Sequence, residues 1–295
     1  MGRPGEAFRR VVASERAFVL AVGGFSIELP GASLVTNERV PVPAFNYGQI
    51  DHVGRERQAA FFERALDHYF QRALRPSFRA PAPAPAHIDA GLRHFGFVPT
   101  ESPLVVLESS GSVPTGARAP EDLHVEAVGA EEIDRILPFW AGPRDRDELR
   151  RALEVALVHA NPGERLVPWV AEKDGRDRSA AILYEEDGAI GLHAVATQPE
   201  ARGGGAATEL VRRVLESERA AGSGRIGMVV PHRRIAARLE TLGFEVVGEL
   251  VAYELPPAAE LHIPPPGPPT PPRWRPPRRP PAASGSPGAG GAAAR

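Results

Sequence analysis

The sequence predicts a mixed α/β fold, and three observations support that prediction. In residues 123–256, short apolar runs of strand character alternate with stretches whose apolar residues recur at helical spacing. A helix that ends at a glycine, followed by a phenylalanine and an apolar strand, occurs twice, at 91–97 and at 238–244. The 295 residues are 42% hydrophobic, which allows a sizeable core and, by length, about two domains.

The C-terminal half shows the fuller set of elements. Turns at Asp174-Gly175 and Asp187-Gly188 separate three strand patterns, as in an antiparallel meander. In the helix that follows, Leu210, Val211 and Val214 are spaced to bury one face. In chain order we expect a strand at 124–128, helices at 130–140 and 146–159, strands at 167–172, 180–184 and 190–196, a helix at 205–220, a strand at 225–230, a helix at 233–242 and a strand hairpin from 244 onward.

The N-terminal half is less regular. Residues 25–29 have a strand pattern. A helix predicted at 55–74 carries four large apolar residues near one face: Phe62, Leu66, Tyr69 and Phe70. Residues 79–86 alternate proline and alanine, and proline cannot donate to a strand ladder. We expect this last stretch to be at most an edge strand or a loop.

The recurring order of helix, glycine, phenylalanine and strand predicts a duplication of one supersecondary unit. We therefore divide the chain into a first domain at 1–112, a linker at 113–122, a second domain at 123–256 and a tail at 257–295. The tail is dominated by proline, arginine, glycine and alanine, so it buries too little to offset its ordering entropy and is predicted to be disordered. It is either a solvated tail or a ligand for a polyproline-binding partner.

Composition excludes several classes of function. The chain has no cysteine, which rules out disulfides, thiolate nucleophiles and cysteine-based zinc sites, and we expect no metal. A formal net charge of −2 gives no reason to expect a nucleic-acid partner. No apolar run approaches the length of a membrane helix, and the run at 17–22 is too short for a signal peptide. We expect a cytoplasmic protein without a membrane partner.

Residues 192–207 are the most informative segment, because an apolar strand, a turn, a glycine cluster and a helix start follow one another. Glycines let the backbone approach a ligand closely, and a helix start offers unpaired N–H donors at its positive end. This pattern predicts a phosphate or pyrophosphate cradle at 202–207. A P-loop would need Lys and Ser or Thr where Ala206-Ala207 stands, and the spacing does not fit a Rossmann fingerprint.

The cradle resembles the signature loop of the GNAT acetyltransferases, in which Arg or Gln is followed by x-x-Gly-x-Gly or Ala. The likeness extends to residues 195–200 before the loop and to Leu242-Gly243-Phe244, which matches the end of a second family motif. It implies a GNAT-like fold, here in two copies, and acetyl-CoA as co-substrate. The backbone of Val195, Ala196 and Thr197 would bind the pantetheine arm, and a peptide N–H near His193 would polarise the thioester carbonyl. The resemblance implies that the pyrophosphate is held by the backbone of Arg202, Gly203, Gly204, Gly205, Ala206 and Ala207.

Three positions depart from the family pattern. His232 stands where many members have Asn, Leu239 where many have a proton-donating Tyr, and Ala189 where some have a basic Glu. The candidate replacements are His193, Tyr184, Tyr253, Glu185, Glu186 and His232. Each also has a structural interpretation: Glu185 and Glu186 as a solvated turn, His193 and Tyr253 as packed strand residues, and His232 as a helix cap or a CoA contact.

The first half contains no Arg-x-x-Gly-x-Gly loop and resembles the degenerate N-terminal halves of tandem GNAT proteins. The resemblance implies an N-acetyltransferase in which an amine attacks acetyl-CoA directly, with the first half forming a wall of the acceptor site. Its acceptor would be a small-molecule amine or a protein amine, and a homodimer is left open. Two alternatives remain: a non-catalytic acyl-CoA-binding regulatory module, and an interaction protein that works through the proline-rich tail.

Overall fold

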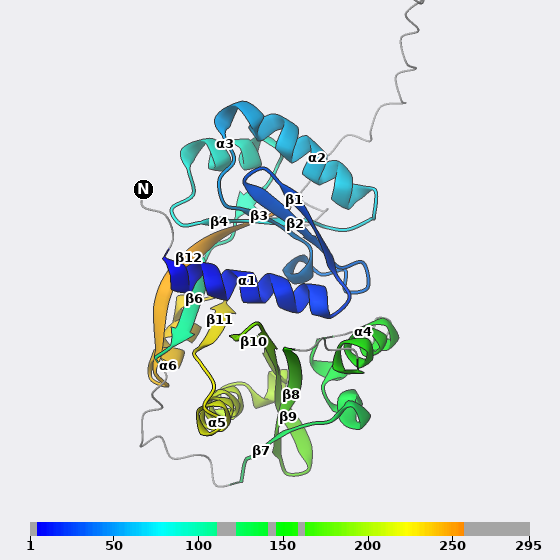
Figure 1. The fold of residues 1–295 in the computed structure, drawn as a ribbon, viewed down its shortest axis with the longest axis vertical. Coiled ribbons are helices and arrows are strands. Elements are labelled where there is room, and N and C mark those ends of the chain that lie inside the picture. The colour runs from blue at the N-terminus through cyan, green and yellow to red at the C-terminus, as the bar shows by residue number, and fades with distance from the viewer. Residues whose placement is uncertain (1–4, 111–121, 141–145, 159–162, 257–295) are drawn as a thin grey trace, which may run out of the picture. The chain divides into compact units, whose positions relative to one another are not determined.

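The computed structural model of this chain describes residues 5–110, 122–140, 146–158 and 163–256 (Figure 1). The N-terminal half forms α1 (Glu6–Ala21), β1 (Phe25–Leu29), β2 (Ala32–Thr36), η1 (Pro43–Phe45), β3 (Tyr47–Ile50), η2 (Arg55–Arg57), α2 (Gln58–Phe70), β4 (Ser77–Pro81), α3 (Ala86–His94), β5 (Val98–Pro99) and β6 (Leu104–Ser109). The C-terminal half forms β7 (His124–Ala127), η3 (Ala130–Arg135), η4 (Leu137–Phe139), α4 (Arg146–Val158), β8 (Glu164–Lys173), β9 (Arg176–Glu186), β10 (Ala189–Thr197), η5 (Pro199–Ala201), α5 (Ala206–Ala220), β11 (Ile226–Val230), α6 (Arg233–Glu240) and β12 (Phe244–Glu254). The predicted mixed α/β fold is confirmed.

All these strands join one sheet, in the order β1-β2-β3-β4-β12-β6-β11-β10-β9-β8-β7, with β5 beside β12. The two halves of the chain exchange strands at its centre. β6, from the N-terminal half, lies between β11 and β12 and is antiparallel to both. β12, from the C-terminal half, pairs in turn with β4 and β5.

Because of this exchange, Met1–Pro256 is one compact unit. The predicted boundary between 1–112 and 123–256 therefore divides the sequence into two halves without separating two independent bodies. The predicted linker at 113–122, apart from Asp122, and the predicted tail at 257–295 lie outside the described residues.

The helix–glycine–phenylalanine pattern has the same structure in both halves. α3 and α6 are each followed by a glycine in the left-handed region, Gly96 with φ of 85° and Gly243 with φ of 88°. Glycine takes this conformation without the steric penalty of a Cβ atom. The phenylalanines that follow, Phe97 and Phe244, are buried, and each leads into a strand of the shared sheet. The order β3, α2, β4, α3 thus recurs as β10, α5, β11, α6.

Helices cover both faces of the sheet in the C-terminal half. Successive residues of β9 point to opposite faces, so Ala181 and Leu183 pack with α5 and α6, while Ile182 and Tyr184 pack with α4, η3 and α1. In the N-terminal half, α2 and α3 bury Phe62 and neighbouring apolar residues against β2, β3 and β4.

Helix α1 is not among the elements predicted from the sequence, yet it lies across the centre of the sheet, against β10, β11 and β6 (Figure 1). Phe8, Val11 and Ser14 recur every third residue and so share one face of the helix. Each faces a glycine on a strand: an added Cβ would lie 2.3 Å from Phe8 at Gly248, 2.6 Å from Val11 at Gly227, and 2.4 Å from Ser14 at Gly191. The three glycines allow α1 to approach the sheet closely.

Other sequence predictions need correction. Residues 79–81 belong to β4, an inner strand between β3 and β12, although an edge strand or loop was expected at 79–86. Pro81 is the last residue of β4, so the missing donor falls where the ladder ends. The helix expected at 130–140 is instead the two short 3-10 turns η3 and η4, interrupted near Pro138, which cannot continue an α-helical ladder. In α2, Phe62 and Tyr69 are buried as predicted, but Phe70 is 55% exposed.

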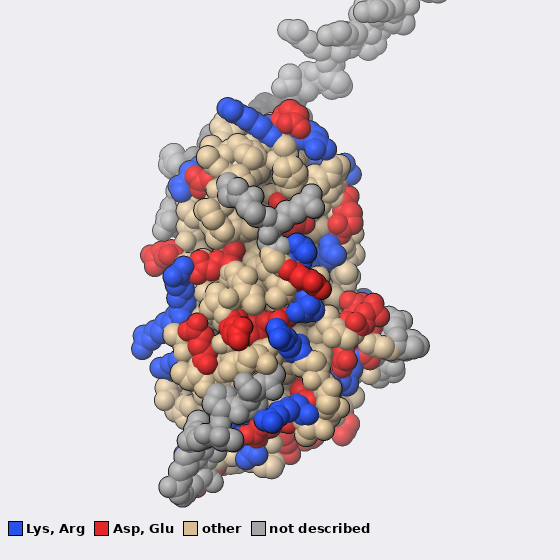
Figure 2. Space-filling view, turned by 60° about the vertical axis from the view of Figure 1, so that its left-hand side comes forward, with Lys and Arg blue, Asp and Glu red and all other residues tan. Residues whose placement is uncertain are grey.

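The surface carries mixed charge. Figure 2 shows Lys and Arg interspersed with Asp and Glu over the face that it presents, without a continuous basic stripe. None of the described helices is long and apolar enough to cross a membrane.

Candidate functional site

The strands β10 and β11 part after a very short parallel ladder. Only Ile190 with Ile226 and Gly191 with Gly227 are in register. β10 continues through 192–197 and β11 through 228–230 without pairing with each other; their outer edges pair with β9 and β6. On the facing edges, backbone N–H and C=O groups are therefore left without ladder partners between these two strands, as a ligand-binding edge requires.

A bulge lies in β10 at this gap. His193 pairs with Ile182 and Ala196 pairs with Ala180, so Ala194 and Val195 together stand opposite Ala181. Ala194 has a φ of 53°, in the left-handed region that a residue with a Cβ rarely adopts. Side-chain donors hold the carbonyls on either side of Val195: Trp140 Nε1 donates to Ala194 at 2.5 Å, and Ser179 Oγ donates to Ala196 at 2.6 Å.

The glycine loop follows β10 directly and leads into α5. Gly203 and Gly205 turn the chain with φ values of 85° and 83°. Gly205 is the N-cap of α5, and no side chain of a described residue caps this helix end. Within the described part of the chain, the amides of Gly203, Gly205, Ala206 and Ala207 donate to no backbone or side-chain acceptor. Unpaired amides at the positive end of a helix dipole form an anion site.

The remaining predicted cofactor-binding residues lie along the same path. Thr197 Oγ1 is 3.2 Å from Ser179 Oγ at the end of β10. Arg202 is exposed, and its guanidinium makes no ion pair with a described residue. Gly204 is exposed in the loop, and Ala206 is buried in the core beneath it. Val195, Ala196 and Thr197 lie at the end of β10, directly before the loop, and His232 is the exposed N-cap of α6, with no side-chain capping bond to a described residue.

His193 lies under α1 on the face opposite α5. It is 8% exposed, its ring stacks on Phe18 with centroids 4.6 Å apart, and its Nε2 is 3.4 Å from Ser14 Oγ. Burial lowers the pKa of His193 to about 3, because the charged imidazolium would lose its hydration. The imidazole is therefore neutral at pH 7, and in this closed arrangement it is a weak proton acceptor.

The two candidate tyrosines lie in different places. Tyr184 is buried beside His193, with ring centroids 6.5 Å apart, and burial raises the pKa of its hydroxyl above the usual range. Tyr253 is in the separate core of the N-terminal half, where its hydroxyl donates to Asp89 at 3.0 Å. The structure brings His193 and Tyr184 together but does not bring Tyr253 to them.

The remaining acid and base candidates sit at the far end of β10 from the glycine loop. Glu185 accepts from Arg165 at 3.0 Å. Burial, followed by the nearby Glu164 and Asp187, raises the pKa of Glu186. Leu239 of α6 is buried in the core, and Ala189 begins β10 opposite Glu186. Neither Leu239 nor Ala189 can exchange a proton, so the acid and the base that the family pattern places at these two positions are missing.

Three residues of this region were missed from sequence: Ser14, Phe18 and Trp140. Phe8, Val11 and Phe18 recur at helical spacing, so the period could have revealed α1, but nothing local indicates that the helix lies on β10. Trp140 follows η4, and only the fold shows that its indole reaches the bulge.

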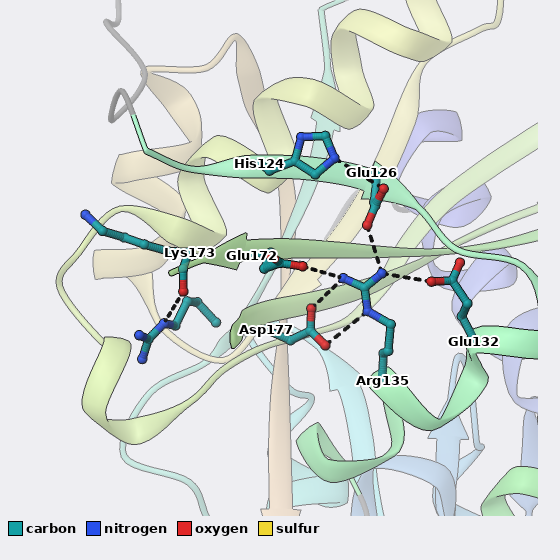
Figure 3. Close-up of polar contacts among 8 residues, drawn as sticks. His124, Glu126, Glu132, Arg135, Glu172, Lys173 and Asp177 are labelled. Atoms are coloured by element: carbon teal, nitrogen blue, oxygen red, sulfur yellow. Dashed lines mark hydrogen bonds and ion pairs between the residues drawn. The ribbon is translucent and has the colours of Figure 1, made fainter. Parts of the chain in front are cut away.

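A hub of ion pairs anchors the turns that carry Trp140 (Figure 3). Arg135, at the end of η3, makes two hydrogen bonds to Asp177 of β9, at 2.7 and 3.1 Å. It also binds Glu126 of β7 at 2.8 Å, Glu172 of β8 at 3.2 Å and Glu132 of its own turn at 3.0 Å. The guanidinium thus ties η3 to three neighbouring strands. Among the described residues there is no group of carboxylates and histidines that could hold a metal ion.

A parted strand pair that leads into a glycine-rich helix start has the geometry that a phosphorylated ligand with an extended arm would need. Residues 130–244 match the family model described as Acetyltransferase (GNAT) family. The chain therefore carries a GNAT-family domain, as the sequence resemblance predicts, and this family supports acyl transfer as its general chemistry.

Solved structures show the same fold. The chain is similar to a GCN5-related N-acetyltransferase from Kribbella flavida, with 15% identity, coverage of 86% of this chain and 96% of that chain, and a TM-score of 0.59. A GCN5-related N-acetyltransferase-like protein from Streptococcus suis 89/1591 gives 13% identity, coverage of 83% and 100%, and a TM-score of 0.56. A functionally unknown conserved protein from Staphylococcus epidermidis gives 11% identity, coverage of 79% and 95%, and a TM-score of 0.59. A comparison with curated proteins gives no match.

Proposed function

We propose that this chain is an N-acetyltransferase that moves an acetyl group from acetyl-CoA to an amine. The observation that supports the proposal most strongly is the β10–β11 gap leading into the uncapped start of α5. The gap offers free backbone groups to an amide-containing arm, and the helix start offers free amides to a pyrophosphate.

The residues present fit such a co-substrate. The backbone at 195–197 would hold the pantetheine arm, and the amides of Gly203, Gly205, Ala206 and Ala207 would hold the pyrophosphate. Arg202 is exposed beside these amides, and its charge would offset part of the phosphate charge. A Cβ added at Gly203 would meet nothing within 4 Å, so the loop has open space in front of it.

The proposed reaction is a direct transfer. The nitrogen lone pair of a neutral amine attacks the thioester carbonyl, the C–N bond forms, the C–S bond breaks, and the amine proton passes through water to the departing thiolate. Peptide N–H groups at the β10 bulge would stabilise the developing oxyanion. The neutral His193 and the protonated Tyr184 are buried under α1 and would exchange no proton with the substrate at pH 7. The acceptor would be a small-molecule amine or a protein amine that arrives deprotonated.

A second function is favoured by one specific feature: the absence, at Leu239 and Ala189, of the acid and base of the family pattern. A module that binds acyl-CoA without turning it over needs the gap and the loop but neither of those groups. Turnover distinguishes the two functions, whereas binding of acetyl-CoA is common to both.

The test is an assay of CoA release with a thiol-reactive dye, in the presence of a panel of small amines and amine-terminated peptides. Because the chain contains no cysteine, the protein itself contributes no thiol signal. Saturable, amine-dependent thiol release is expected for the transferase. Binding of acetyl-CoA without release for any amine in the panel would favour the regulatory module instead.

A further inference from the structure

The β10 bulge holds Ala194 in a backbone conformation that is unfavourable for alanine. Ala194 lies at φ 53°, where its Cβ crowds the backbone, so a residue with a Cβ rarely adopts this conformation. Its carbonyl accepts the hydrogen bond of the Trp140 indole, which comes from a different part of the chain. A long-range side-chain contact therefore offsets the strain of a residue beside the β10–β11 gap.

Because the peptide bond is planar and trans, the hydrogen bond to the Ala194 carbonyl also sets the direction of the next N–H group. The carbonyl of Ala194 and the N–H of Val195 belong to one peptide unit, in which C=O and N–H point in opposite directions. When Trp140 fixes the carbonyl, it also fixes the Val195 N–H, which points away from the indole. The carbonyl of Ala196 is fixed by Ser179 at 2.6 Å, so the peptide before Val195 and the peptide after Ala196 are both restrained.

Trp140 is itself well anchored. It is half-buried and packs against the cluster that contains Ile136, Leu153 and Tyr184. The η3 turn before it is tied to β7, β8 and β9 through Arg135 (Figure 3). The indole donor thus follows turns that are tied to the sheet, and its ring packs on the core.

We propose that Trp140 is a positioning residue for the acyl-CoA site: its indole N–H holds the Ala194 carbonyl and thereby orients the Val195 N–H at the bulge. The proposal rests on the proposed function, since it assigns the bulge a ligand. Trp140 touches the backbone of β10 and not the reacting atoms, so its effect is on the geometry that the ligand meets.

The chain offers a closely matched control. Trp169 is a second tryptophan in the C-terminal half; it is buried, and its indole N–H has no hydrogen-bond partner among the described residues. Trp140→Phe and Trp169→Phe remove the same atoms from two packed rings, and only the first removes a hydrogen bond. Ala194→Gly removes the left-handed penalty and lets the bulge persist without the indole.

The experiment is calorimetric titration of the full chain with acetyl-CoA. Trp140→Phe is expected to bind about tenfold more weakly than the wild type, the loss of about one hydrogen bond. Trp169→Phe is expected to stay within about twofold of the wild type, and Trp140→Phe/Ala194→Gly to recover to within about threefold. Wild-type affinity in Trp140→Phe, or a double variant as weak as the single one, would overturn the inference. A wild type that binds no acetyl-CoA would instead overturn the proposed function.

A second measurement does not depend on the folding of Trp140→Phe. The chain has three tryptophans, so a sample labelled with ¹⁵N-tryptophan gives three indole N–H signals, assignable with Trp169→Phe and Trp274→Phe. Acetyl-CoA is expected to shift the Trp140 signal and to leave the Trp169 signal in place. Binding that leaves the Trp140 signal unmoved would contradict the positioning role.

Discussion

The close approach of α1 to β11 leads to a quantitative prediction at Gly227. An alanine there would place its Cβ 2.6 Å from Val11 Cγ2, about 1 Å inside ordinary contact. Both residues are deeply buried in the sheet–helix contact, so the helix must shift or the side chain must leave its rotamer. Overpacking of this kind destabilises a core by about 1–3 kcal/mol, and we expect about 2 kcal/mol for Gly227→Ala.

The compensating change is Val11→Ala, which removes the two methyl carbons nearest to the new Cβ and leaves only the Val11 Cβ, at 3.1 Å. Alone it loses about 1.6 kcal/mol of apolar burial and leaves a small cavity, so we expect about 2 kcal/mol of destabilisation. In the double variant the Cβ introduced by Gly227→Ala occupies part of that cavity. The total should be about 2 kcal/mol instead of the additive value of about 4 kcal/mol, a coupling of about 2 kcal/mol.

Urea unfolding of the wild type, both single variants and the double variant measures this coupling. Gly224→Ala is the matched control, because its Cβ would meet nothing within 4 Å, and its effect should stay within about 0.5 kcal/mol. Additivity of the two single effects within about 0.5 kcal/mol would show that Val11 and Gly227 do not touch, and would refute the placement of α1 on β11.

Three further predictions follow from the strand exchange, the buried histidine and the arginine hub. Deleting residues 1–112 removes β6 and β4 from both sides of β12, so the remaining chain should show no cooperative melt; a cooperative melt would contradict the exchange. Burial lowers the pKa of folded His193 to about 3, whereas its unfolded pKa is about 6.5, so between pH 7 and 5 the unfolded state takes up more protons than the folded state. The wild type should therefore lose about 2 kcal/mol more stability than His193→Gln between pH 7 and 5; equal losses in the two proteins would contradict this. Arg135→Gln should cost about 2 kcal/mol in urea unfolding, because it leaves four carboxylates without their shared donor, against less than about 0.5 kcal/mol for the more exposed Arg150→Gln.

Sequence patterns predicted much of the C-terminal half because its elements alternate and are closed by turns and glycines. The helix at 205–220, the strand at 225–230 and the repeated Gly-Phe ends have local causes, and the structure has them within a few residues. The glycine loop was predictable for the same reason, since positive φ at Gly203 and Gly205 needs glycine.

What the sequence did not reveal is set by contacts between distant segments. Pro81 argued against an inner strand, yet β4 is paired on both sides because β12 returns from the other half of the chain. The candidate role of His193 as a base depended on exposure, and α1, whose position no local pattern encodes, buries it. Tyr253 was a candidate by residue type alone, and the exchange places it in the core of the N-terminal half.

The measurement that tests the acyl-CoA site most directly is calorimetric titration of acetyl-CoA and CoA into the full chain and two glycine variants. Gly203→Glu puts a carboxylate at the positive end of α5, where the pyrophosphate would bind; Gly222→Glu puts the same side chain just beyond the other end of that helix. The two glycines have similar backbone strain, with φ of 85° and 73°, and both face open space. We expect micromolar binding by the wild type and Gly222→Glu, and a loss of about a hundredfold in Gly203→Glu. Equal affinity in all three, or no binding by the wild type, would show that the loop at the start of α5 is an ordinary turn.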